Sequence, residues 1–271
     1  MNIGKPERLL HTQFARSLRK PFRQAVNEYR LITPGDHIAV CISGGKDSML
    51  LALLIKDLAE ETEAAFSFTC IAMDPGYSLA HRSHIAENAH RLEISLNFFE
   101  TNILRIAGRH SPEHPCFLCS KMRRGYLYAE AQRLGCTKIA LGHHFDDAIE
   151  TILMGMLYGG QVQAMLPRLP SKNYPGMELI RPMYFVREQA VSDWAEACGM
   201  RFESCGCPAA QKGIDTKRAE IKKLIAQLSA KNPQVEKNIL NAVKSVDTRK
   251  LLGWRDAEGE HSFLDVFGDC M

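Results

Sequence analysis

Short apolar runs alternate with helix-like segments along most of the chain, and this alternation restricts the fold more than any other feature. The apolar runs, several of them rich in β-branched residues, lie at 37–42, 67–73, 94–101, 137–142 and 178–183. Helical patterns lie at 47–60, 81–92, 120–134, 146–158 and 187–198. Such alternation predicts an α/β fold, with a doubly wound parallel sheet and helices on both faces. Ligands of such sheets bind at the carboxyl ends of the strands.

The two ends of the chain differ in character from this α/β region. A basic helix is expected over about 6–30. A charged, helix-periodic stretch after residue 207 is interrupted at Asn232-Pro233, which predicts two helices, and residues 253–271 look like an irregular tail. The sequence therefore predicts three parts, which are a basic helical segment at 1–34, an α/β domain at 35–207 and a small helical region at 208–271.

Composition and charge narrow the class of protein. No apolar run approaches the roughly 20 residues that a membrane-spanning helix needs, and the sequence MNIGKPERLL lacks the apolar core of a secretory signal. We therefore expect a cytoplasmic protein with no membrane segment. The net charge is +3, and basic residues gather in the first 30 positions together with Phe14, Phe22 and Tyr29. This pattern suits contact with a phosphate backbone, and it suits a solvated amphipathic helix equally well.

The stretch CISGGKDSML, residues 41–50, joins the first apolar run to a helix. It satisfies neither the Walker pattern nor the dinucleotide-binding pattern. Its glycines, free helix amides and lysine form an anion site, and a carboxylate beside them suits a magnesium ion that bridges phosphate oxygens. We expect ATP whose pyrophosphate leaves, held by Ser43, Gly44, Gly45, Lys46, Asp47 and Ser48.

A second polar element, LGHHFDDAIET at 141–151, also follows a predicted strand and opens a helix. Its position places Gly142, His143, Asp146 and Asp147 on the same edge of the sheet as the glycine-rich loop. Two adjacent acids at a helix start also serve as simple caps, and Asp146 fits that role.

Nine cysteines are many for a chain of this size in a reducing compartment. Four of them, Cys41, Cys70, Cys136 and Cys198, lie in apolar patterns and are expected to be small buried hydrophobes. Four others lie beside prolines and glycines in predicted loops, and these are Cys116, Cys119, Cys205 and Cys207. The spacing alone fits a zinc site, a redox pair or an iron–sulfur site.

These motifs together resemble a known family. SGGKDS resembles the PP-loop of the N-type ATP pyrophosphatases, and LGHHFDDAIET resembles an element of their tRNA-modifying branch. The stretch 116–160, with C-x-x-C, RRG, LGHH-x-DD and YGG in order, resembles the tRNA 2-thiocytidine synthetase (TtcA) family. The resemblance implies that Asp47 and Asp147 organise magnesium and that Arg123, with Arg124, neutralises phosphate or steers tRNA. It also implies that Met73 and Gly142 contact the nucleotide.

The same resemblance implies a 4Fe-4S cluster held by three cysteines, with one iron open to bind sulfide. Cys116 and Cys119 match the first two ligands. We take Cys207 as the third ligand and keep Cys205 as the alternative, because Cys205-Gly206-Cys207-Pro208 departs from the C-x-x-C of the family pattern.

The activity that this resemblance implies is ATP-dependent thiolation of tRNA. The enzyme would adenylate the C2 carbonyl of cytidine 32 in the anticodon loop and replace the oxygen with sulfur, giving 2-thiocytidine. The expected partners are tRNA, a sulfur donor such as a cysteine desulfurase, and a second copy of the chain in a homodimer. The alternatives are a PP-loop thiolase that acts on a uridine or through a persulfide, and a non-catalytic metal-containing tRNA-binding protein.

Overall fold

The computed structural model describes residues 5–62, 65–103, 106, 115–202 and 216–267, and the side chains of 115–121, 216 and 266–267 lie outside this description. Contacts along the chain divide it into two compact units. Unit 1 comprises residues 1–148 and 165–216, and unit 2 comprises residues 149–164 and 217–271. The division predicted at residues 34 and 207 stays a prediction.

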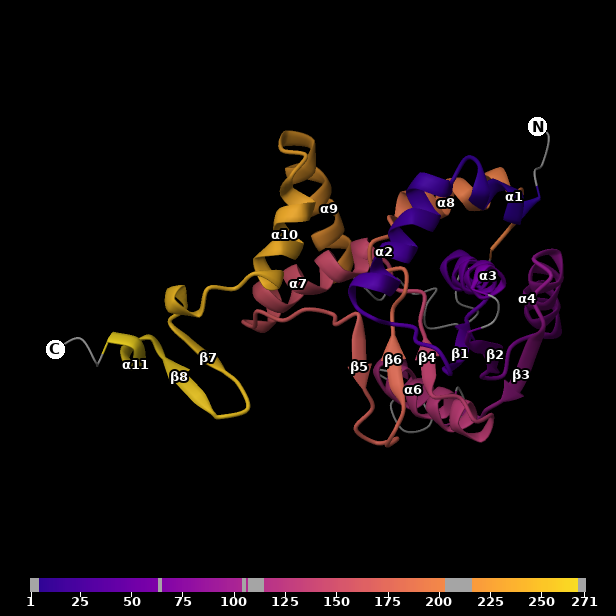
Figure 1. The fold of residues 1–271 in the computed structure, drawn as a ribbon, viewed down its shortest axis with the longest axis horizontal. Helices are drawn as coiled ribbons and strands as arrows, with labels where there is room; N and C mark the ends of the chain where they lie inside the picture. The colour runs from indigo at the N-terminus through magenta and orange to yellow at the C-terminus, as the bar shows by residue number, and fades with distance from the viewer. Residues whose placement is uncertain (1–4, 63–64, 104–105, 107–114, 203–215, 268–271) are drawn as a thin grey trace. The chain divides into compact units, whose positions relative to one another are not determined.

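Unit 1 is built on a six-stranded sheet with the order β3-β2-β1-β4-β6-β5 (Figure 1). All neighbouring strands are parallel except β5, which runs antiparallel to β6 at the edge. This confirms the predicted α/β fold with a mostly parallel sheet. The strands are β1 (His37–Ile42), β2 (Ser67–Asp74), β3 (Leu96–Glu100), β4 (Lys138–Ala140), β5 (Arg168–Pro170) and β6 (Glu178–Ile180).

The register of the central strands places their carboxyl ends at one edge of the sheet. Val40 of β1 pairs with Ala140 of β4, and Ala140 pairs with Ile180 of β6. The residues that follow these three strands therefore start from the same edge. Parallel strands buried on both faces are apolar along their whole length, as the sequence HIAVCI of β1 is.

Helices cover both faces of this sheet. The helices that alternate with the strands of the sheet along the chain are α3 (Lys46–Glu61), α4 (Leu79–Arg91), α6 (Pro115–Arg133), α7 (Phe145–Gly159), whose later part belongs to unit 2, and α8 (Glu188–Ala197). Ala39 and Cys41 of β1 pack with Tyr128 and Ala131 of α6 in one buried cluster. Side chains alternate between the faces of a strand, so the buried Ile38 and Val40 point to the other face, where α3 contacts β1 and β2.

The amino-terminal segment is broken where the sequence predicted one helix over 6–30. It forms α1 (Pro6–His11), a π-helical turn η1 (Ala15–Arg19) and α2 (Lys20–Glu28). Phe14 and Phe22, which the sequence offered to a phosphate backbone, are buried core residues with exposed fractions of 4% and 1%. Arg19 is bound to Asp57 of α3 at 2.7 Å. Part of the basic charge of this segment is therefore used to attach it to an acidic face of α3.

Unit 2 contains the two helices predicted after residue 207, α9 (Thr216–Lys231) and α10 (Val235–Lys244), which are separated at Pro233. A short 3₁₀ turn, η3 (Thr248–Lys250), follows them. The expectation of an irregular tail over 253–271 is wrong, because a hairpin of β7 (Gly253–Arg255) and β8 (Glu260–Ser262) forms there, followed by α11 (Phe263–Phe267). Three-residue strands carry too little alternation to be recognised in a sequence. Of the helices that the structure describes, none is both long and apolar enough to span a membrane.

Candidate functional site

The glycine-rich loop after β1 has a conformation that its residues dictate. Gly44 has φ +87°, and a Cβ added there would lie 2.7 Å from Ile85 Cγ1 of α4. Such a φ is rare for any residue with a side chain, so both conformation and space demand glycine at this position. The loop therefore passes close under α4 before it enters α3.

The hydroxyl of Ser48 fixes the shape of this loop. Its Oγ accepts the Ser43 amide at 3.1 Å and donates to the Gly45 carbonyl at 2.9 Å. The Ser43 hydroxyl lies 3.1 Å from the same oxygen. Ser48 is 5% exposed, so in this structure its hydroxyl holds the turn, while the exposed Ser43 lies at the surface of the loop.

The first turn of α3 carries the charged members of the motif. Helix starts leave backbone amides without carbonyl partners and present the positive end of the helix dipole. The Lys46 ammonium bonds to the Asp47 carboxylate at 2.9 Å and lies 3.9 Å from Glu188. Both side chains of the Lys46–Asp47 pair are partly exposed. The arrangement can bind an anion through amides and an ammonium, and a cation through a carboxylate.

The two sequence motifs meet at Gly142. A Cβ added to Gly142 would lie 3.1 Å from the carbonyl carbon and oxygen of Asp47 and from the Ser48 amide nitrogen. Backbone therefore touches backbone, and only glycine permits this distance without displacement. This confirms that the glycine-rich loop and the element at 141–151 lie on the same edge of the sheet.

The adjacent acids of the second motif have different partners. Asp147 forms a reciprocal cap with His144: its Oδ2 accepts the His144 amide at 2.9 Å, and its own amide donates to His144 Nδ1 at 3.3 Å. Asp146 instead accepts the Glu188 amide at 2.7 Å and bonds to Arg187 at 3.1 Å. Asp146 thus caps α8 and ties the starts of α7 and α8 together, which is a structural role.

Helix α6 connects the cysteine motif to the same edge of the sheet. The expectation that the C-x-x-C lies in a loop before a helix near Ser120 is wrong, because α6 begins at Pro115 and includes Cys116 and Cys119. One turn further, Met122 packs in a cluster with Met73 near the carboxyl end of β2. Arg123 is half-buried on this helix. The backbone of the C-x-x-C therefore lies a single helical turn from a residue at the nucleotide edge.

The cysteines that the structure describes behave as predicted. Cys41, Cys70, Cys136 and Cys198 are all buried. Burial raises the thiol pKa to about 12 for Cys70 and to about 11 for Cys136 and for Cys198. These thiols remain protonated at neutral pH and act as small apolar groups. The predicted cluster ligands Cys205 and Cys207, and the side chains of Cys116 and Cys119, lie outside the described residues.

Two polar residues at this edge were missed from the sequence. Asp74 ends β2, is 6% exposed, and accepts the amides of Gly76 and Tyr77 at 2.9 and 2.7 Å. Arg181 directly follows β6 and is 8% exposed. Asp74 is the last residue of β2 and Arg181 is the first residue after β6, so both stand at the carboxyl end of an apolar strand, where a charged residue is too common to single out a site.

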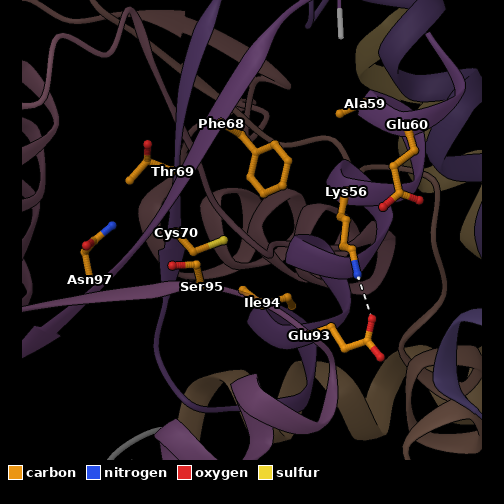
Figure 2. Close-up of a pocket in the computed structure, with 10 residues that line it drawn as sticks. All are labelled: Lys56, Ala59, Glu60, Phe68, Thr69, Cys70, Glu93, Ile94, Ser95 and Asn97. Carbon is orange, nitrogen blue, oxygen red and sulfur yellow. Dashed lines mark ion pairs between the residues drawn. The ribbon is translucent and has the colours of Figure 1, made fainter. Parts of the chain in front are cut away.

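A cavity of about 390 Å³ lies elsewhere in unit 1 (Figure 2). It is lined by residues from the start of β2, such as Phe68 and Thr69, and from the segment that leads into β3. Figure 2 shows Lys56 of α3 facing Glu93 across it, at 3.8 Å. None of the predicted site residues lines this cavity.

The glycine loop, its contact with Gly142 and the sheet order define a class of protein. The PP-loop domain family matches residues 10–227, and the chain belongs to this family. A relative from Anaeromyxobacter dehalogenans (strain 2CP-C), named tRNA-cytidine(32) 2-sulfurtransferase, is 35% identical over 260 residues, which are 93% of this chain and 88% of that protein. One of the same name from Syntrophotalea carbinolica is 35% identical over 249 residues, which are 90% and 94% of the two chains.

These similarities are high enough to define the family more narrowly: within the PP-loop proteins, the chain belongs to the tRNA-cytidine(32) 2-sulfurtransferase family. A solved structure has the same fold, with a TM-score of 0.67 and 20% sequence identity. It is the U34-tRNA thiolase NcsA from Methanococcus maripaludis with its [4Fe-4S] cluster, and the match covers 90% of this chain and 85% of that one.

Proposed function

We propose that this protein is an ATP-dependent tRNA thiolase that converts cytidine 32 of the anticodon loop to 2-thiocytidine. The observation that carries this proposal is the junction at Gly142, where the two motifs of an ATP site touch, in a chain whose relatives bear the name tRNA-cytidine(32) 2-sulfurtransferase. Magnesium, the iron–sulfur cluster and the individual roles of the residues are parts of the proposal.

The first half of the reaction makes the carbonyl oxygen of the base a leaving group. The base O2 attacks the α-phosphorus of ATP, an O–P bond forms, and pyrophosphate leaves with the electrons of the broken P–O bond. Negative charge grows on the phosphate oxygens in this step. The amides of the first turn of α3 and the Lys46 ammonium face this charge, and fixed donors of this kind lower the barrier.

The second half replaces the activated oxygen. Sulfide attacks C2 of the base, the C2–O bond breaks, and AMP leaves with the oxygen. When bound, a [4Fe-4S] cluster held by Cys116, Cys119 and Cys207, or Cys205 in place of Cys207, would supply this sulfide. The placement of Met122 against Met73 supports this arrangement, because it brings the helix that carries Cys116 and Cys119 to the nucleotide edge.

The carboxylates divide the remaining tasks. Asp47 stands on the first turn of α3 and has a partly exposed side chain, which suits a magnesium ligand. Asp147 is the second proposed ligand, and its reciprocal cap with His144 fixes its carboxylate in one orientation. Arg123, half-buried on α6, would neutralise phosphate, and Met73 and Gly142 would border the nucleotide.

The test is a mass analysis of nucleosides from the tRNA of cells that lack the gene. We expect 2-thiocytidine alone to disappear and to return with the wild-type gene but not with the D47A variant. Loss of a thiouridine instead would support the uridine alternative. Unchanged thionucleosides, together with tRNA binding but no release of pyrophosphate from ATP, would support the non-catalytic alternative.

A colour measurement tests the cluster separately. Protein purified without oxygen should be brown, and the C116A variant should be colourless while it keeps its affinity for ATP. Colourless wild-type protein that contains zinc would contradict the iron–sulfur proposal. The homodimer and a cysteine desulfurase as sulfur donor remain predictions, which the mass of the protein in solution and reconstitution with a purified desulfurase would test.

A further inference from the structure

Arg181 stands at the nucleotide edge of the sheet. It is the first residue after β6, and Ile180 before it pairs with Ala140 of β4. Leu141, the residue after the end of β4, leads directly into Gly142, which touches the glycine-rich loop. The Arg181 amide donates to the Pro167 carbonyl at 2.9 Å, and its carbonyl accepts the Tyr184 amide at 3.2 Å. The backbone that carries Arg181 is therefore fixed on both sides.

The guanidinium of Arg181 is buried and incompletely paired. The residue is 8% exposed. Its Nη1 donates to the Leu166 carbonyl, but its buried Nε has no hydrogen-bond partner among the residues that the structure describes. Within the same residues, no carboxylate lies at ion-pair distance from it. A buried charge of this kind is costly unless something pairs with it.

The surroundings of Arg181 favour an anion as the missing partner. Burial and the positive charge of Arg124 on α6 lower the pKa of Arg181 to about 10, against the opposing effects of Tyr184, Tyr128 and Asp147. An anion bound to Arg181 would offset this destabilisation through charge-assisted hydrogen bonds. Planar guanidinium groups bind phosphate through two parallel hydrogen bonds.

Arg168, on the strand β5 that pairs with β6, provides a comparison, because its contacts are those of a purely structural arginine. Arg168 of β5 binds both oxygens of Glu178 on β6, at 2.9 and 2.7 Å, and donates to the Arg30 carbonyl at 3.1 Å. Its charge is balanced, although its side chain is 39% exposed. Arg181 is far more buried and lacks such a carboxylate partner.

We propose that Arg181 binds a phosphate group of a reacting nucleotide. The phosphate belongs either to ATP or to the tRNA backbone next to the reacting base. This inference rests on the proposed function, since it assumes that both substrates meet at this edge. Arg181 thereby adds a substrate contact to Lys46 and the amides of α3, from the other side of β4.

The experiment compares R181M and R181K with R168M and R168K as matched controls. Binding of ATP with magnesium and of an unmodified tRNA transcript is measured for each variant at two salt concentrations, together with its melting temperature. Loss of a charge-assisted contact to phosphate should weaken one of the two ligands by about 10–100-fold in R181M. R181K should recover only part of this loss, and the Arg168 variants should bind both ligands normally.

The ligand that weakens identifies the source of the phosphate. Weaker ATP binding with normal tRNA binding assigns the phosphate to ATP, and the reverse, with a shallower salt dependence, assigns it to tRNA. Normal affinity for both ligands in folded R181M or R181K overturns the proposal, even if the melting temperature falls, because Arg181 would then only hold the Leu166 carbonyl. If R181M fails to fold, R181K decides by the same criteria.

Failure of this inference differs from failure of the proposed function. If wild-type protein makes 2-thiocytidine while the Arg181 variants bind both ligands normally, only the role of Arg181 is wrong. If wild-type protein binds ATP and tRNA but makes no 2-thiocytidine, the proposed reaction is wrong, and the binding comparison between Arg181 and Arg168 still reports on the phosphate contact.

Discussion

The two ends of the central strands treat charge in opposite ways. At the amino end, Lys138 is 4% exposed, and its ammonium bonds to Asp36 at 2.6 Å and to the Leu31 carbonyl at 3.0 Å. At the carboxyl end, the buried Nε of Arg181 has no hydrogen-bond partner among the described residues. A buried charge that is paired inside the protein needs no ligand, whereas a buried charged group with an unpaired donor can gain a partner from one.

The most direct test of this comparison removes one member of the buried ion pair at the amino end of the strands. Changing Lys138 to methionine leaves the Asp36 carboxylate buried without its cation, and we expect a loss of about 3–5 kcal/mol in the free energy of unfolding. Urea denaturation measures this loss. Activity per folded molecule should stay normal, and a comparable loss of ATP affinity would show that the two ends are not separate.

The reciprocal change at the nucleotide end is Asp47→Asn, which keeps the shape of the side chain. We expect pyrophosphate release to fall on the order of 10²–10³-fold, as when one fixed electrostatic contact to a transition state is lost. The melting temperature should stay within a few degrees of wild type, because the carboxylate is partly exposed and pairs only with Lys46 in this part of the loop. A large fall in melting temperature with activity kept would contradict the assignment.

A smaller effect is expected where the two motifs touch. Gly142→Ala places a methyl group 3.1 Å from the backbone of Asp47 and Ser48, and overpacking of this kind costs about 1–3 kcal/mol. We expect weaker ATP binding in titration calorimetry as the loop is displaced. Gly135→Ala is the control, because a Cβ there meets nothing within 4 Å while φ is +71°. That variant should lose stability through backbone strain alone and bind ATP normally.

The smallest expected effect is the pH dependence of the stability that Asp36 contributes at the amino end of the strands. Burial of Asp36 acts to raise its pKa, but hydrogen bonds from Lys138 and Thr33 outweigh it, so the pKa is lowered on balance. The contribution of this carboxylate to stability is therefore complete above the pKa of an unfolded aspartate, and it is lost as the pH falls through the lower folded value. The difference in unfolding free energy between wild type and D36N should shrink over that acid range. A difference in unfolding free energy that stays constant over this pH range would contradict the lowered pKa of Asp36.

Local chemistry explains which parts of the fold could be predicted. Strand β1 begins and ends where the sequence predicted, at His37 and Ile42, because five consecutive apolar residues before a glycine-rich turn have few alternatives. Strand β5 and the hairpin at 253–262 were missed, since strands of three residues are held by their pairing rather than by their own composition. The amino-terminal helix is broken just before α2, whose first turn contains Pro21, and Arg19 at this break pairs with Asp57, which is remote in sequence.

The site shows the same division between local and remote information. The sequence named the glycine-rich loop and the motif at 141–151, because anion and magnesium sites need particular residue types in adjacent positions. It did not show that Asp146 and Asp147 have different partners, because the partner of Asp146 lies 41 residues away at the start of α8. Arg181 escaped notice because an arginine after a strand is ordinary until its burial is known.

The sequence by itself determined the strands, the turn chemistry and the family motifs, all of which depend on residues within one strand–turn–helix unit. The tertiary structure decided which motif touches which, through the register that aligns β1, β4 and β6. It also decided which charges find protein partners and which do not. The physical reason is that burial and charge pairing depend on distances between elements, and a linear sequence does not contain those distances.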